Sequence, residues 1–305
     1  MTAQFFIEAF ISVVGLTTPL LLAGLGELVV EKSGVLNLGV EGMMLIGALT
    51  GFAVTVMTFN PWFGILGAAV AGAVLALLFG VMVLSLNSNQ VATGLALTLF
   101  GIGLSSLIGS QFFQGRIIPQ FGSIFPTSLS KDPILQLFFG YSPIVYFAIF
   151  MVVAVGWFLK STRAGLILRA VGENDHSAHS IGYSVIGVRY AAIAFGGAMA
   201  GIGGAYFTMV ITPMWTNQIT AGRGWLALSL VVFAGWRTGR LLMGAFFFGI
   251  LMSLEFYAKA GFSFMPTQFW AAMPYLMTIV ALTVISSRGN VGASAPACLG
   301  KPFLP

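Results

Sequence analysis

The chain has 305 residues, of which 58% are hydrophobic and 7% charged, and its mean hydropathy is +0.99. A soluble globular domain carries about 25% charged residues, so the composition excludes that class and predicts an all-α, polytopic helical membrane protein. The net charge of +5 does not indicate nucleic-acid binding, because no basic run with interleaved aromatic residues accompanies it. The single cysteine, Cys298, excludes an intramolecular disulfide and a cysteine metal cluster.

Nine apolar runs are candidates to cross ~30 Å of hydrocarbon. They cover roughly 8–30, 35–58, 62–85, 89–110, 134–159, 187–211, 224–236, 241–258 and 268–285. The run at 224–236 is short and could join the following run as a broken or tilted element. We therefore expect a single transmembrane domain over residues 1–305 with about 8–10 helices.

The first polar interruption lies at residues 27–42, where three carboxylates, one asparagine and three glycines interrupt a hydrophobic region. Glu31 and Lys32 fit a turn at the cytoplasmic surface. The glycines and the polar side chains that follow predict a broken helix near 34–44, as in membrane segments that line a transport pathway.

Asn37 and Glu41 differ from the rest of this interruption, because their spacing of four residues would place both on one helix face heading into the bilayer. A charged side chain costs about 2.5–3.5 kcal/mol at the centre of a transmembrane helix, so such residues usually face protein or a water-filled path. One interpretation is that Glu41 lines a translocation pathway. The other is that it lies near the interface and pairs with Lys32 or Arg240.

A further polar cluster comprises Asn87, Asn89, Gln90 and Thr93, at the start of a predicted span. These residues are either part of the substrate pathway or a cytoplasmic turn with an asparagine cap. The glycine-rich stretch at 196–204 is interpreted as a surface for close helix packing.

Charge is concentrated between residues 160 and 189. This stretch holds both histidines and six charged residues: Lys160, Arg163, Arg169, Glu173, Asp175 and Arg189. If it is cytoplasmic, nine basic residues lie inside, namely Lys32, Lys160, Arg163, Arg169, Arg189, Arg237, Arg240, Arg288 and Lys301. Four lie outside, namely Arg116, Lys131, Arg223 and Lys259. The excess of basic residues in cytoplasmic loops of membrane proteins therefore predicts the N-terminus outside and the C-terminus inside.

A short helix is predicted near 174–182. Asn174 is suited to the N-cap, Asp175 lies in the first turn, His179 lies in the last turn and Gly182 follows the end. A helix of about two turns is marginal alone in water, which favours a helix braced against another protein. An ordinary solvated loop is the alternative.

Other chemistry has little support in the sequence. Glu173, His176 and His179 could contribute to a metal site, but no cysteine or second ligand cluster supports one, and no metal is expected. Gly300-Lys301 lacks the glycine spacing of a nucleotide-binding loop, and no catalytic triad, metalloprotease helix or haem motif is present. The chain is therefore not expected to be an enzyme or to hydrolyse ATP itself.

Four blocks resemble the permeases of nucleoside and simple-sugar ABC transporters, within the larger group that includes ribose and branched-chain amino acid permeases. They are GELVVEKSGVLNLGVEGMM at 26–44, NQVATGLAL at 89–97, TRAGLILRAVGEN at 162–174 and TAGRGWLALSLV at 220–231. The segment APACLGKPF at 295–303 is similar as well. Asp175 departs from the family pattern, in which proline usually occupies this position.

The resemblance implies a permease subunit of a bacterial importer in the inner membrane. A second permease, expected to be a different chain, would complete the pathway. ATPase subunits carrying ATP and Mg would dock inside, and a substrate-binding lipoprotein would deliver from outside. The cytoplasmic loop at about 160–187 would couple the ATPase through six residues: Gly165, Arg169, Gly172, Glu173, Asn174 and Gly182.

The substrate is expected to be a nucleoside. Asn37, Asn87, Asn89, Gln90 and Thr93 offer neutral amide and hydroxyl groups, which suit a neutral ribose-bearing molecule. Ribose or another simple sugar is the alternative. A further alternative is a cation-coupled secondary transporter in which Glu41 is the coupling carboxylate. Such a transporter needs no docking helix for a soluble partner.

Overall fold

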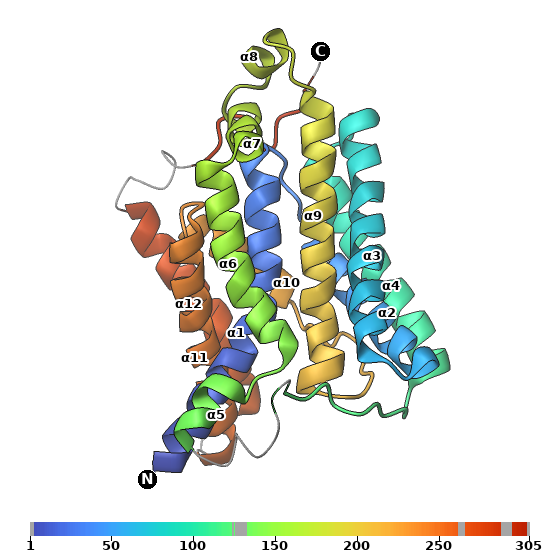
Figure 1. The fold of residues 1–305 in the computed structure, drawn as a ribbon, viewed down its shortest axis with the longest axis vertical. Helices are drawn as coiled ribbons and strands as arrows, with labels where there is room; N and C mark the ends of the chain where they lie inside the picture. Colours follow the sequence, from blue (N-terminus) through green and yellow to red (C-terminus); the bar gives the residue numbers. More distant parts are fainter. Residues whose placement is uncertain (1–2, 124, 126–132, 262–265, 288–294, 304–305) are drawn as a thin grey trace.

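The computed structural model of the protein describes residues 3–123, 125, 133–261, 266–287 and 295–303. Regular structure in these ranges is helical, apart from an isolated bridge between Ile117 and Met214. The long helices stand roughly side by side in Figure 1, with α8 and the C-terminus at one end of the bundle and the N-terminus at the other. We call the first of these ends the α8 end. The termini thus lie at opposite ends, as the sequence predicted.

The α-helices, in chain order, are α1 (Ala3–Lys32), α2 (Val40–Thr58), α3 (Pro61–Gly80), α4 (Gln90–Ile108), α5 (Pro133–Phe139), α6 (Pro143–Ser161), α7 (Arg163–Glu173), α8 (Asp175–Ser180), α9 (Val185–Tyr206), α10 (Arg223–Phe233), α11 (Thr238–Gly261) and α12 (Thr267–Ser287). Three of them continue into a π-helical turn: α3 into η1 (Val81–Ser85), α4 into η2 (Gly109–Phe113) and α9 into η4 (Phe207–Ile211).

Seven of the described helices are long and apolar enough to cross a membrane: α1, α2, α3 with η1, α4 with η2, α6, α9 with η4, and α11. The predicted run at 224–236 forms α10, a helix of only 11 residues that a turn separates from α11. The predicted run at 268–285 forms α12, which has 21 residues. The protein is therefore an all-α polytopic membrane protein, and the short run is a separate half-length helix.

The centre of the bundle is built on small residues. Helix α9 stands between α1 on one side and α2 and α3 on the other (Figure 1). A Cβ added at Gly47 of α2 would overlap the backbone of Gly201, and one added at Gly72 of α3 would overlap the backbone of Gly197. The glycine-rich stretch of α9 thus lets three helix backbones approach closely, which is the packing role predicted for it.

Candidate functional site

The chain breaks between α1 and α2, at residues 33–39. Gly34 has a φ of +91°, which ends the continuation of α1. Asn37 organises the rest of the break, because its Oδ1 accepts from the Gly39 N–H at 2.9 Å. Both carboxylate oxygens of Glu27 accept from Asn37, Oε1 from the backbone N–H at 3.3 Å and Oε2 from the side-chain Nδ2 at 3.4 Å. A broken helix predicted near 34–44 is therefore present, and α2 is regular from Val40 onward.

Glu41 lies in the first turn of α2, and its side chain joins α2 to α10. Its Oε1 accepts from the Thr220 hydroxyl at 2.5 Å and from the Gly222 N–H at 2.8 Å. Its Oε2 accepts from the Gly224 N–H at 2.6 Å. Gly222 is the N-cap of α10 and cannot provide a side-chain cap. The Glu41 carboxylate thus takes the place of that cap, at a helix end where negative charge is favourable.

We call Glu27, the break at 33–39, Glu41 and residues 220–224 the broken-helix junction. Helix α10 rises about 1.5 Å per residue over 11 residues, which makes about 16 Å. Its far end leads to Trp236, whose indole N–H donates to Glu31 near the end of α1 at 2.5 Å. Glu41 therefore lies up to about 16 Å inside the α8 end of the bundle. Only 4% of Glu41 and 1% of Asn37 are exposed, so neither side chain faces lipid.

One detail of the sequence prediction for these two residues is wrong. Asn37 and Glu41 were expected to share a helix face, but α2 begins only at Val40 and Asn37 precedes it. Asn37 bonds to α1, whereas Glu41 bonds to the segment before α10 and to the first turn of α10. Pairing of Glu41 with Lys32 or Arg240 does not describe the structure either, because both Glu41 oxygens accept from residues 220–224.

The polar cluster at 87–93 lies apart from Glu41. Asn87 and Asn89 are exposed, and Asn89 caps α4 by accepting from the Ala92 N–H at 3.0 Å. Thr93 is buried, and its hydroxyl bonds to that of Ser88 at 2.9 Å. Gln90 is the member that reaches the junction, since its Oε1 accepts from the Leu36 N–H at 2.8 Å. The structure thus connects this cluster to the break at one point and forms a capped turn with the rest.

The segment at 160–187, which we call the polar segment, forms two helices at the α8 end. Asn174 caps α8 by accepting from the Ser177 N–H at 2.9 Å, and Gly182 follows the helix with a φ of +92°. The short helix and both of its ends are as predicted. Gly165 and Gly172 allow α7 to pack closely, because added Cβ atoms would overlap the carbonyl oxygens of Phe158 and Lys32.

The expectation that Asp175 is simply a first-turn charge misses its main contact. Its Oδ2 accepts from Nη2 of Arg189 at 3.1 Å, and the two side chains are 7% and 0% exposed. Arg189 also donates from Nε to the carbonyl oxygen of Ser33 at 3.1 Å. A buried ion pair thus connects the start of α8 to the start of the break at 33–39.

The C-terminal segment at 295–303, which we call the tail strap, crosses the same region. The Cys298 N–H donates to the Gly172 carbonyl at 2.9 Å, and the Gly300 N–H donates to the Gly34 carbonyl at 3.2 Å. The ring of Phe303 lies 5.6 Å from that of His176 and 5.5 Å from that of His179. The two histidines that sequence offered as metal ligands therefore pack on an aromatic ring.

The comparisons with known proteins agree with this architecture. Residues 9–282 match the family model described as branched-chain amino acid transport system / permease component. The chain belongs to this permease family. It is 40% identical, over 92% of its length and 93% of the relative's, to a candidate glucose ABC transporter permease protein, TsgC13, of Haloferax volcanii. It is 31% identical, over 94% and 93%, to the guanosine ABC transporter permease protein NupQ of Bacillus subtilis. It is 29% identical, over 89% and 90%, to the nucleoside ABC transporter permease protein NupC of Lactococcus lactis. No solved structure matches.

The permease is accordingly a membrane-embedded transport subunit and not an enzyme. Family membership implies association with ATPase and substrate-binding components. Sequence reasoning named Asn37 and Glu41 as site candidates but did not name Thr220, Gly222 or Gly224. These three residues lie in the block at 220–231, which contributed to the family resemblance. No contact between this block and Glu41 was predicted from the sequence.

Proposed function

We propose that the permease forms the substrate pathway of an ATP-driven nucleoside importer and that its α8 end is cytoplasmic. The observation that carries this proposal is the Arg189 contact between α8 and the break. One guanidinium bonds both to Asp175 at the start of α8 and to the Ser33 carbonyl at the start of the break. A displacement of α8 by an ATPase subunit would therefore reach the broken-helix junction through a single side chain.

A neutral substrate suits the groups at this junction. Both oxygens of Glu41 and both oxygens of Glu27 already accept hydrogen bonds from the protein. A cationic substrate would have to displace those donors, which would leave backbone N–H groups without an acceptor. A nucleoside carries hydroxyl and ring groups and no net charge. Relatives named for guanosine and for nucleosides support this substrate class.

A simple sugar is the second candidate, and a specific observation favours it. The relative at 40% identity is named for glucose, and a sugar offers the same neutral hydroxyl chemistry. The deciding experiment is uptake of labelled guanosine and uridine into proteoliposomes that contain the complete complex with its ATPase and binding protein. We expect ATP-dependent uptake that excess unlabelled nucleoside abolishes and excess glucose or ribose does not. Competition by sugar alone would replace the nucleoside proposal with the sugar one.

Two further results would contradict other parts of the proposal. Uptake that persists without ATP, while a proton gradient is maintained, would indicate a secondary transporter. The orientation is tested with Ser177→Cys, at an exposed position of α8, in a Cys298→Ser background. A membrane-impermeant thiol reagent should label this position from the cytoplasmic side. Labelling from the outside only would show that the α8 end faces outward.

A further inference from the structure

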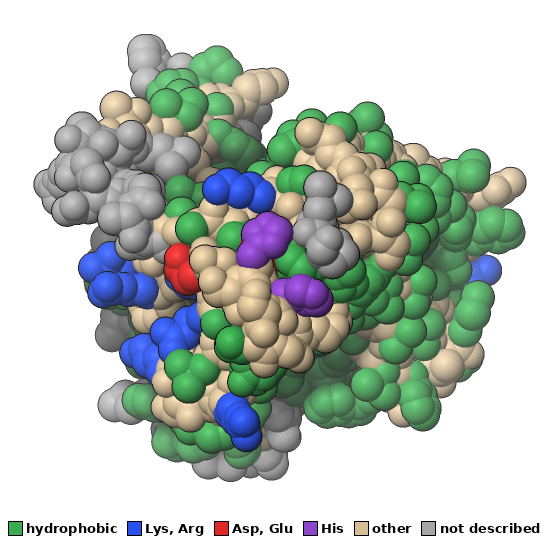
Figure 2. Space-filling model, turned by 90° about the horizontal axis from the view of Figure 1, so that it is seen from above, with side chains coloured by type: hydrophobic (Ala, Val, Ile, Leu, Met, Phe, Trp, Pro, Cys, Tyr) green, Lys and Arg blue, Asp and Glu red, His purple; other side chains and the backbone are tan. Residues whose placement is uncertain are grey.

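A hollow of about 490 Å³ lies at the α8 end, where the ends of α1, α6 and α7 meet the turn before α11. Its lining includes four basic side chains, Lys32, Lys160, Arg169 and Arg237, and one carboxylate, Glu173. The charged side chains of the wall therefore sum to +3, from four positive and one negative group. Figure 2 views this end and shows basic side chains gathered on one side of it, with an acidic side chain among them. We call this hollow the basic pocket.

Two further features of the wall favour an anion. The first turn of α11 supplies Thr238 and Gly239, and a helix N-terminus carries partial positive charge and N–H groups without helical partners. The Nε of Arg169 is buried and has no hydrogen-bond acceptor among the described residues. The volume lies within the roughly 300–1,000 Å³ that small-ligand sites occupy. The basic pocket thus combines charge, donors and space for a phosphate-sized group.

The basic pocket lies at the ends of three membrane-spanning helices. Lys32 is the last residue of α1, Lys160 is the penultimate residue of α6, and Arg237 directly precedes α11. The pocket therefore lies at the level where these membrane-spanning helices end. Below it, α6 exposes 67% of Val153 and α11 exposes 65% of Met243, both within four residues of the wall along their helices. Acyl chains that cover these apolar side chains would place their phosphate at the pocket.

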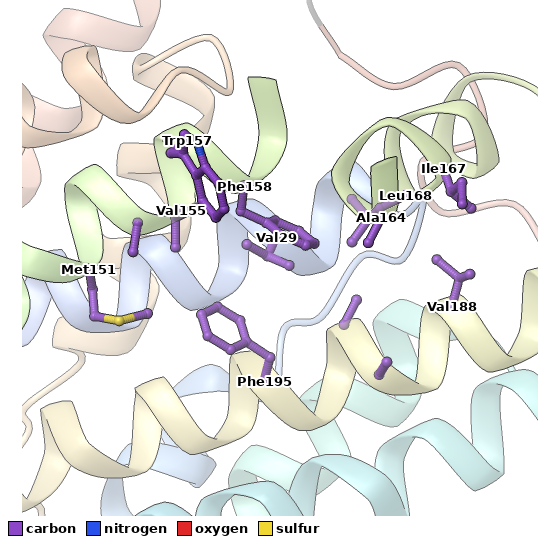
Figure 3. A pocket seen from close by; sticks show the side chains of 13 residues that line it. Val29, Met151, Val155, Trp157, Phe158, Ala164, Ile167, Leu168, Val188 and Phe195 are labelled. Carbon is purple, nitrogen blue, oxygen red and sulfur yellow. The ribbon is translucent and has the colours of Figure 1, made fainter. Parts of the chain in front are cut away.

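A second hollow, of about 510 Å³, lies on another face of α6 and differs in chemistry (Figure 3). It is bounded by α1, α6, α7 and α9, and its lining is apolar, with Phe158 and Phe195 prominent. Nothing in that wall distinguishes one lipid headgroup from another. The contrast shows that the charge of the basic pocket is specific to one side of α6.

From these observations, we propose that the basic pocket binds the phosphate headgroup of an acidic phospholipid. Basic pockets between transmembrane helices on the cytoplasmic side are established sites for acidic headgroups. The four cations would supply the binding free energy, and the carboxylate of Glu173 lowers the summed charge of the wall to +3. The proposal does not depend on which molecule the permease transports, but it rests on the proposed cytoplasmic orientation of the α8 end.

The test compares two double variants of the full-length permease, each of which removes two positive charges from the α8 end. Lys160→Gln with Arg237→Gln alters the wall of the basic pocket. Arg163→Gln with Arg240→Gln alters exposed basic residues that do not line it. The purified proteins are titrated with phosphatidylglycerol and with phosphatidylcholine in detergent, and bound lipid is counted by native mass spectrometry.

We expect the wild-type protein and the Arg163/Arg240 variant to retain phosphatidylglycerol in preference to phosphatidylcholine. The Lys160/Arg237 variant should bind phosphatidylglycerol at least roughly tenfold more weakly, since each basic residue contributes about 1 kcal/mol to acidic-lipid binding. Equal weakening in both variants, or no headgroup preference in the wild type, would overturn the proposal. So would displacement of the lipid by inorganic phosphate at equal concentration, which would indicate a free-phosphate site.

A protein ligand would give a distinct result. If the basic pocket instead receives an acidic side chain of the ATPase, the Lys160/Arg237 variant should lose ATPase binding while its phosphatidylglycerol retention equals that of the control variant. That outcome would also overturn the lipid proposal. Thermal unfolding of each variant in detergent shows whether it is folded, and both double variants change only side chains that are exposed at the surface.

Discussion

Glu41 provides a sensitive test of the broken-helix junction, because one buried carboxylate accepts three hydrogen bonds. Substitution by alanine would leave the buried N–H group of Gly224 and the partly buried N–H group of Gly222 without the acceptor that Glu41 provides. Each such group costs about 1–3 kcal/mol, so Glu41→Ala should lower the free energy of unfolding by about 2–6 kcal/mol. The upper part of this range applies if water does not enter the space left behind.

Smaller changes at the same place should give smaller losses. In Glu41→Gln, one oxygen can still accept, but the amide nitrogen faces a backbone N–H, so we expect a loss of about 1–3 kcal/mol. Thr220→Val removes one donor and leaves the others paired, which should cost about 0.5–1.5 kcal/mol. The predicted destabilisation therefore increases from Thr220→Val to Glu41→Gln and is largest for Glu41→Ala.

The assay is thermal unfolding of the purified permease in detergent with a fluorogenic thiol reagent. Cys298 is the single cysteine and is buried, so the reagent reports the opening of the fold. The recovery of the monodisperse protein after heating provides a second measurement. Glu8→Gln, at an exposed position of α1, is the matched control and should leave both measurements unchanged. Equal effects of Glu8→Gln and Glu41→Gln, or a wild-type melting temperature for Glu41→Ala, would refute the assigned role of Glu41.

Three further predictions concern the polar segment. Glu173→Lys should leave the protein in the membrane but allow ATP hydrolysis without substrate uptake. Both rates would be measured in the reconstituted complex, and normal uptake would contradict the prediction. Asp175→Asn removes the negative partner of a buried ion pair, and we expect a loss of about 3–5 kcal/mol of stability because the Arg189 guanidinium stays buried. A double-mutant cycle with Arg189→Gln should show strong coupling between the two residues. Additive effects would argue against the pair. Gly172→Ala should lower the melting temperature, because the new Cβ meets the carbonyl at the end of α1, whereas Gly103→Ala meets no atom within 4 Å and should be neutral.

Local features of the sequence predicted local structure well. Asn174 and Gly182 delimit α8 because caps depend on residues only a few positions apart. The break after α1 was predictable for the same reason, since Gly34 and the polar residues around it interrupt an apolar run. Uncharged runs identified the long helices because transfer into lipid depends on composition more than on partners.

Contacts between distant segments could not be predicted in the same way. Glu41 and Gly224 are 183 positions apart, and no periodicity within α2 or α10 indicates that they meet. The i, i+4 spacing of Asn37 and Glu41 was misleading because the helix begins between them. Arg189 was one of the basic residues used to predict the orientation in the membrane. Its burial could not be predicted, because it depends on Asp175 and Ser33, which lie beside it only in the folded protein.

The tail strap has a consequence for the order in which the protein is made. Gly300 bonds to the carbonyl of Gly34, so a segment that is translated after all the described helices closes onto the break that follows the first of them. The described helices can insert into the membrane before this contact exists, and until then the break and α7 lack the backbone hydrogen bonds that Gly300 and Cys298 donate to them. Closure of so long a loop is slow compared with local helix formation. The α8 end is therefore completed only after all the described helices have been synthesised.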